Sequence, residues 1–166
     1  MVKKFIGLLF LVCHITTSST LHAGTTETLM YFISENRIPA ALELIQSRKV
    51  NVNTLSEAEW APLHHAAAKR SCLEIVKALV AGGADVNLID TNGWTALHYA
   101  ANNNNAPAIN YLLSQHANPN ITAQDGMTPL QLAIRGEYSA CIEALIQSGA
   151  ISPNEISSSS QKIETE

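Results

Sequence analysis

The sequence has few aromatic residues, few charges and no run of basic residues. Aromatic side chains make up 5% of its 166 residues and charged side chains 14%, and the net charge is −4. A chain without a basic cluster has little attraction for a phosphate backbone or an anionic membrane surface, so we expect no nucleic acid partner. Because 46% of the residues are hydrophobic but so few are aromatic, alanine, leucine and isoleucine must supply most of the core.

The sequence also lacks the motifs on which enzymes and metal proteins depend. It contains no nucleophile elbow, no phosphate-binding loop and no metal-binding helix motif. We therefore expect a protein that is not an enzyme and needs no cofactor and no metal. Binding of another protein is the function class that this composition leaves open.

The N-terminal segment has the organisation of a secretory signal peptide. Lys3 and Lys4 precede a mostly apolar stretch over Phe5–Ile15, and a polar segment then leads to the small residue Ala23. The apolar stretch is shorter than the roughly 20 residues of a membrane-spanning helix. We expect residues 1–23 to be a cleaved signal peptide, with no stable membrane insertion afterwards and a periplasmic or secreted product. The alternative, an N-terminal core helix, would normally show a clearer polar face.

Two motifs recur in step along the rest of the chain. The first is an eight-residue segment with leucine at its fourth position, found at residues 60–67, 94–101 and 127–134, which start 34 and 33 residues apart. The second is a turn that ends in asparagine, and its copies contain Asn87 and Asn120. Two motifs with one period predict a repeat protein in which each unit packs against its neighbours.

The first motif resembles the Thr-Pro-Leu-His-x-Ala signature of the ankyrin repeat family, and the second resembles its Gly-Ala-Asp-x-Asn turn. Ala61, Ala96 and Gln131 depart from the signature Thr, Pro and His. The resemblance implies an all-α fold, an ankyrin repeat solenoid with projecting hairpin-like loops. It implies an ankyrin repeat domain over residues 24–151, with about four helix–turn–helix repeats at about 25–56, 57–90, 91–123 and 124–151.

Both ends of this array are less regular than its middle. The first repeat lacks the signature and is placed by register alone, because Leu29 lies 34 residues before Leu63. A degenerate first copy is typical of a terminal cap, one side of which faces water. Residues 152–166 contain Pro153 and four consecutive serines, and they predict a disordered polar tail.

Local patterns predict where the helices begin and end. Pro62 and Pro129 suit the first turn of a helix, where a missing N–H is harmless. Thr95 and Thr128 are placed to cap helix starts with their hydroxyl groups. Over residues 73–80 the apolar positions 73, 76, 79 and 80 form one face, flanked by Ile75, and Gly82-Gly83 then ends the helix.

Histidine and cysteine are better explained by structure than by chemistry. His64 and His98 occupy the signature position, and the resemblance implies that their imidazoles bond the turn to neighbouring backbone and hydroxyl groups. They are one repeat apart, about 10 Å, which is too far to share a zinc ion. We expect Cys141 to be buried and Cys72 to be half exposed near a turn. Two repeats of separation exclude a disulfide between them.

The predicted binding surface is centred on Trp60, Trp94 and Met127, which precede the three signature segments. Stacked repeats would line these residues up along the concave face, where tryptophan is an enriched interface anchor. The alternative is that the rings only pack on neighbouring repeats. Further candidates lie on the inner helices and loop tips: Lys69, Asn102, Asn103, Arg135, Glu57, Thr91, Asn92 and Gln124.

These observations predict an exported protein-interaction module, monomeric or in a hetero-complex, that binds another protein through its concave face and loop tips. The run from Asn102 to Asn105 would supply adaptable amide hydrogen bonds or be a solvated turn. The alternative function is a structural or regulatory subunit of a stable envelope or membrane-associated complex. Fold does not name the ligand, because scaffolds of one shape bind different partners.

Overall fold

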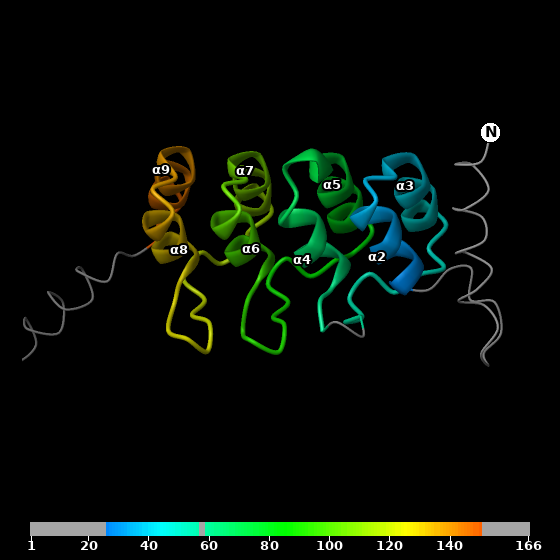
Figure 1. Cartoon of the computed structure of the whole chain (residues 1–166), viewed down its shortest axis with the longest axis horizontal. Helices are drawn as coiled ribbons and strands as arrows, with labels where there is room; N and C mark the ends of the chain where they lie inside the picture. The colour runs from blue at the N-terminus through cyan, green and yellow to red at the C-terminus, as the bar shows by residue number, and fades with distance from the viewer. Residues whose placement is uncertain (1–25, 57–58, 151–166) are drawn as a thin grey trace, which may run out of the picture.

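The computed structural model describes residues 26–56 and 59–150, and within these ranges the chain is helical with no β-strand (Figure 1). The helices are α2 (Thr26–Ser34), α3 (Ile38–Gln46), α4 (Pro62–Ala67), α5 (Leu73–Ala81), α6 (Ala96–Asn102), α7 (Ala106–Ser114), α8 (Pro129–Arg135) and α9 (Ser139–Gln147), and a 3-10 turn, η1 (Arg70–Cys72), precedes α5. The predicted signal peptide, the predicted tail and Glu57 lie outside the described residues. No helix in the described part combines the length and apolar character needed to cross a bilayer.

The helices form two layers of an elongated stack. α2, α4, α6 and α8 contact one another in sequence order, and α3, α5, α7 and α9 do the same in the second layer (Figure 1). Each repeat contributes one helix to each layer, and the two helices of a repeat pack antiparallel against each other. The all-α solenoid of four helix–turn–helix repeats is therefore confirmed, and its loops project from the side of the first layer.

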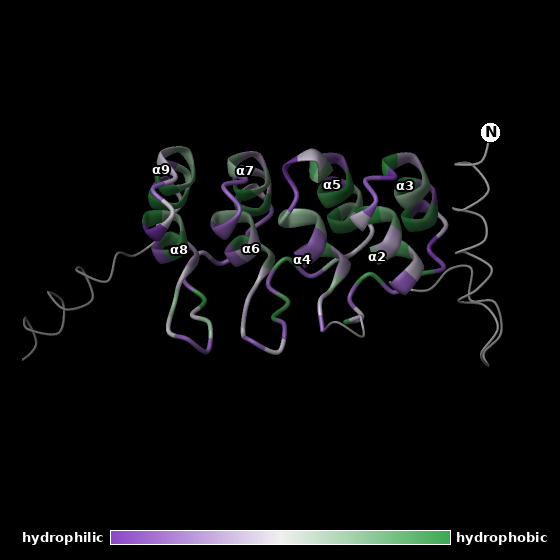
Figure 2. Ribbon diagram, in the orientation of Figure 1, coloured by the Kyte–Doolittle hydropathy of each residue, from purple (hydrophilic) through white to green (hydrophobic). Residues whose placement is uncertain are grey.

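Alanine sets how closely the first-layer helices approach. Ala66, Ala67, Ala100, Ala101 and Ala133 are all fully buried. Their side chains are small enough for neighbouring helices to pack closely, and larger residues such as leucine fill the space between the two layers. Figure 2 shows the hydrophobic residues concentrated on the paired helices, which together enclose one continuous core.

Most of the predicted helix ends are confirmed. Pro62 and Pro129 are the first residues of α4 and α8, and Gly83, with a φ of 95°, follows the end of α5. Thr128 caps α8, because its hydroxyl accepts the N–H of Gln131 at 3.3 Å. Thr95 is likewise the N-cap residue of α6, and its hydroxyl lies 2.9 Å from Nδ1 of His98, the third residue of the helix.

The predicted face of α5 needs a correction. Ile75, expected at the flank, is fully buried together with Val76 and Leu79, whereas Leu73 and Val80 are only partly buried. The helix packs against α4, α3 and α7, so its buried surface is rotated from the face that the apolar pattern suggested.

Cys72 also differs from expectation, because it is fully buried rather than half exposed. The 3-10 turn η1 directs its side chain into the core, where Sγ lies 3.8 Å from Oδ1 of Asn36 in the preceding repeat. Cys141 is buried as predicted, and both residues are free thiols.

A row of asparagines bonds each outer turn to the next. The amide of Asn53 donates to the Gly83 carbonyl at 3.0 Å, and its oxygen accepts the N–H of Asp85 at 2.8 Å. Oδ1 of Asn87 accepts the N–H of Asn118, and the amide of Asn120 donates to the carbonyl of the Gly149 turn. Asn120 thus bonds the adjacent turn in the same way as Asn53 does.

The run from Asn102 to Asn105 is divided between surface and core. Asn102 and Asn103 are exposed, whereas Asn105 has no exposed surface. The amide of Asn105 donates to the carbonyls of Ala67 and Lys69, and its oxygen accepts the N–H of Ala108. Asn105 therefore fits neither predicted alternative, a solvated turn or an amide available to a partner, because its amide satisfies two carbonyls of the preceding repeat.

Asn105→Ala should lower the free energy of unfolding by about 2 to 3 kcal/mol, because it leaves the buried carbonyl of Ala67 and the partly buried carbonyl of Lys69 without their donor. The matched control is Asn102→Ala, an exposed asparagine of the same run, which should change stability by less than about 0.5 kcal/mol. Urea denaturation followed by circular dichroism measures both. Equal stability of the two variants would contradict the linking role of Asn105.

Candidate functional site

The loops between repeats are closed hairpins that present the predicted apolar residues at their bases. The N–H of Asp90 donates to the carbonyl of Trp94 at 3.0 Å, and the N–H of Ala123 donates to that of Met127 at 2.9 Å. The equivalent bond in the preceding loop reaches Trp60. Gly93 and Gly126 reverse the chain with φ values of 77° and 81°, conformations that favour glycine. The predicted hairpin-like loops are therefore confirmed.

Buried imidazoles join each hairpin base to the following loop. Nδ1 of His64 accepts the N–H of Ala61, and its Nε2–H donates to the carbonyl of Leu88 at 2.8 Å. His98 repeats this arrangement with Thr95 and Met127. A ring nitrogen that accepts an amide N–H cannot carry a proton, so both rings must be the neutral tautomer protonated on Nε2. The bonding role implied by the family resemblance is confirmed.

Burial lowers the pKa of both imidazoles and keeps them neutral. Desolvation is the largest cause for His64 and His98, and the hydrogen bonds to the Leu88 and Met127 carbonyls oppose it. In the fourth repeat Gln131 replaces the histidine, and its amide oxygen accepts the N–H of Thr128 at 2.7 Å. The amide therefore preserves the local bond of the imidazole without a titratable group.

The tips of adjacent hairpins are hydrogen-bonded to one another. The hydroxyl of Thr91 donates to Oε2 of Glu59 at 2.6 Å. The Gln124 side chain donates to the Thr91 carbonyl at 2.7 Å, and its backbone N–H donates to the Asn92 carbonyl at 3.0 Å. Thr91, Asn92 and Gln124 are exposed as predicted, but part of their hydrogen-bonding capacity already holds the loops together.

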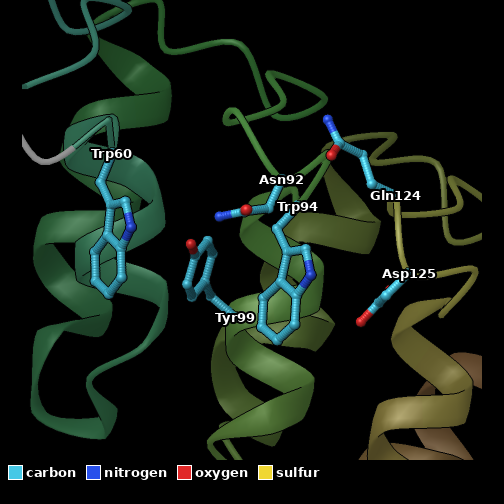
Figure 3. Close-up of a pocket in the computed structure, with 6 residues that line it drawn as sticks. All are labelled: Trp60, Asn92, Trp94, Tyr99, Gln124 and Asp125. Atoms are coloured by element: carbon cyan, nitrogen blue, oxygen red, sulfur yellow. The ribbon is translucent and has the colours of Figure 1, made fainter.

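An aromatic row lies beneath these loops. The Tyr99 ring sits between the two indoles, with centroid distances of 4.8 Å to Trp60 and 5.0 Å to Trp94 (Figure 3). Trp60 and Trp94 are half-buried, and Tyr99 is 7% exposed. The Tyr99 hydroxyl donates to Oδ2 of Asp90 at 2.6 Å. Burial and this bond raise the pKa of Tyr99, so the phenol stays protonated.

A cleft of about 590 Å³ opens beside this row, and we call it the aromatic cleft. Its lining residues are Trp60, Asn92, Trp94, Tyr99, Gln124 and Asp125 (Figure 3). Sequence reasoning predicted four of the six and missed Tyr99 and Asp125. Tyr99 occupies the variable position of the signature segment, where the other repeats carry His65 and Leu132, so comparison of the copies would have revealed an unusual ring.

Trp60 also lines a second cleft, of about 370 Å³, together with residues of the first repeat and His65. The His65 ring lies 5.7 Å from the Trp60 indole, and its buried Nε2 has no hydrogen-bond partner among the described residues. Burial, followed by the nearby charge of Lys69, lowers the pKa of His65. The ring is partly buried.

The remaining predicted residues do not join either cleft. Nζ of Lys69 donates to the Ser34 carbonyl at 2.5 Å and so satisfies the last residue of α2. Asn102, Asn103 and Arg135 are exposed near the far ends of α6 and α8 from the hairpins, and the Asn103 amide donates to the Tyr99 carbonyl. Met127 is partly buried in the core and does not line the aromatic cleft. Of the predicted row Trp60, Trp94 and Met127, only the two tryptophans line the aromatic cleft.

No cluster of three His, Cys, Asp or Glu side chains within residues 26–56 and 59–150 is arranged to hold a metal ion.

Comparison with known proteins identifies the family described as ankyrin repeats (3 copies), which matches residues 3–90 and 65–156. Human protein phosphatase 1 regulatory subunit 27 is 37% identical over 99 residues, which cover 60% of this chain and 63% of that protein. Human ankyrin repeat domain-containing protein 40 is 41% identical over 76 residues, which cover 45% of this chain and 20% of that protein. The chain thus spans less than two thirds of the curated relatives it matches.

Acidification should destabilise the fold through the buried imidazoles. Their unfolded-state pKa is near 6.5 and their folded-state pKa is lower, so between these values the unfolded chain binds more protons. The contribution of the two imidazoles to the free energy of unfolding should be fully present above that range and should be lost as the pH drops through it. Urea denaturation at about pH 7.5 and about pH 5 measures the loss, and His98→Gln should show a smaller loss. An identical pH dependence in the variant would contradict the role of His98.

Proposed function

Because the chain belongs to the ankyrin repeat family, we propose that it is an exported, non-enzymatic module that binds a partner protein through the aromatic cleft and its loop tips. Ankyrin repeats act in protein–protein interaction, so a protein partner follows from the family. The location of the binding surface rests on one observation. Two half-buried tryptophans and Tyr99 line the same cleft beneath the loops.

This cleft has the properties of an interface anchor. Trp60 and Trp94 each pack one part of the indole on Tyr99 and leave the rest accessible, so packing and binding are compatible roles. Tryptophan and tyrosine offer a large contact area at a low cost in side-chain entropy and dominate many interfaces. Around them Asn92 and Gln124 offer amide groups for a polar rim. A surface of this kind suits a specific complex that buries about 800 Å² per partner.

A second candidate function is a regulatory subunit of a stable complex. It is favoured by the similarity to proteins named protein phosphatase 1 regulatory subunit 27 in human and mouse, at 37% and 38% identity. A complex that persists through size-exclusion chromatography at constant stoichiometry would favour the subunit. A monomer that captures its partner reversibly would favour the transient module.

The proposal of export is supported by the sequence of residues 1–23, with two lysines, an apolar stretch and a small residue at its end. In the native host the protein should accumulate outside the cytoplasm with Gly24 as its first residue. Intact-mass spectrometry of the fractionated cells measures this. Recovery of an unprocessed chain that begins at Met1 in the cytoplasm would contradict export and leave the binding surface unaffected.

Trp94→Met should weaken partner capture by at least about tenfold. Methionine is the residue that the fourth repeat carries at this position, so the hairpin accepts it. The partner is first identified by affinity capture with mass spectrometry, and its affinity is then measured by calorimetry. The control is Ile146→Ala, which alters a 56% exposed residue of α9 in the second layer and should leave the affinity unchanged. If Trp94→Met lowers the melting temperature but not the affinity, the ring only packs.

A further inference from the structure

We propose that the aromatic cleft receives an arginine side chain from a basic segment of the partner protein. The inference rests on the proposed function and adds the chemistry of the ligand. The cleft combines three aromatic rings with the exposed carboxylate of Asp125. Arginine matches both features, because its planar guanidinium stacks on aromatic faces and donates in-plane hydrogen bonds to a carboxylate.

Charge on the hairpins favours a basic partner. The described residues of the three hairpins, 55–56, 59–61, 90–95 and 123–128, contain three carboxylates and no lysine or arginine. Within the second to fourth repeats the basic side chains belong to the helices and their connecting turns, and none lines the aromatic cleft. An acidic segment would therefore meet uncompensated repulsion at this surface, whereas a basic segment would be attracted.

Hydrogen bonding shows which carboxylate is available. Asp90 is buried, and its two oxygens accept the N–H groups of Asn92 and Trp94 and the hydroxyl of Tyr99. Asp125 is exposed, and its Oδ1 accepts the N–H of Met127 at 3.0 Å. No described residue donates a hydrogen bond to its Oδ2, which can therefore accept a guanidinium N–H. Asp90 holds the cleft in shape, and Asp125 provides the recognition charge.

Arginine is favoured over lysine by the nature of the cleft walls. An ammonium group is strongly hydrated and gains little from a partly apolar surface, whereas a guanidinium is weakly hydrated and can lie flat on an indole. Asn92 and Gln124 line the same cleft, and their amides have oxygens able to accept the N–H groups that Asp125 does not reach. The cleft thus offers a stacking surface and acceptors together.

Intrinsic fluorescence reports on this cleft, because both tryptophans of the sequence line it, although Trp60 also lines the second cleft. The probe is an acetylated, amidated peptide with three arginines separated by Gly-Ser pairs. It should produce a saturable change in emission that weakens as salt is added. The same peptide with citrulline in place of each arginine keeps the side-chain shape but removes the charge, and it should produce no saturable change in emission. The lysine peptide should bind several-fold more weakly than the arginine peptide.

Two charge-matched variants test the assigned carboxylate. Asp125→Asn should weaken arginine-peptide binding by about threefold, as expected for an exposed ion pair. Asn92 occupies the same position in the preceding hairpin, so that hairpin already accepts asparagine. The control is Asp85→Asn, which removes the same charge from an outer turn where Asn118 makes the equivalent backbone bond. Asp85→Asn should bind like the unaltered protein.

The inference is overturned if the citrulline, lysine or a glutamate peptide binds as tightly as the arginine peptide, or if no peptide binds. It is also overturned if Asp125→Asn binds normally or if both charge variants lose affinity equally. Melting temperatures of the variants verify that each is folded. A native partner that depends on Trp94 but not on Asp125 would leave the proposed function intact and overturn only the arginine assignment.

Discussion

The close approach of the first-layer helices, permitted by buried alanines, is the constraint on which the rest of the structure depends. Ala67 and Ala101 have no exposed surface, and residues of this size let helices pack at the short end of the usual 8 to 10 Å range. Each repeat is too thin to enclose a core alone, so its apolar surface is buried only by its neighbours. Short spacing also brings turn to turn and loop to loop, where Asn53, Asn87 and His98 bond one repeat to the next.

The same spacing creates the aromatic cleft. Trp60 and Trp94 stand one repeat apart at equivalent positions, and the gap between them accommodates a single ring, which Tyr99 supplies at about 5 Å from each indole. Asp90 fixes that ring through the phenolic hydroxyl and at the same time fixes the hairpin through backbone N–H groups. The cleft walls are thereby held before any partner arrives, which reduces the entropy lost on binding. In the fourth repeat Met127 and Leu132 replace the rings, so the row of three ends there.

The periodic part of this architecture could be predicted from the sequence, whereas contacts between repeats could not. Signature spacing located the helix pairs, the hairpins and the two tryptophans, because each depends on a local pattern that recurs. Tyr99, Asp125 and Asn105 were missed or misplaced because their roles depend on residues about one repeat away. The segments of Asp125 and Asn105 carry no signal of those contacts, whereas comparison of the repeat copies would have shown Tyr99 to be an unusual ring. The burial of Cys72 escaped prediction for a related reason, since one 3-10 turn changes the direction of its side chain.

Specific recognition on such a scaffold must come from the few groups that folding leaves unsatisfied. Most polar groups near the loops already have partners: the His64 and His98 imidazoles bond backbone, and the loop tips bond one another. A rigid platform of this kind contributes shape but little chemical selectivity. What differs from one repeat protein to another is then the set of exposed ring faces and free acceptors, here the two indoles and the carboxylate of Asp125. The fold explains how these groups are held together, and their chemistry determines what they can bind.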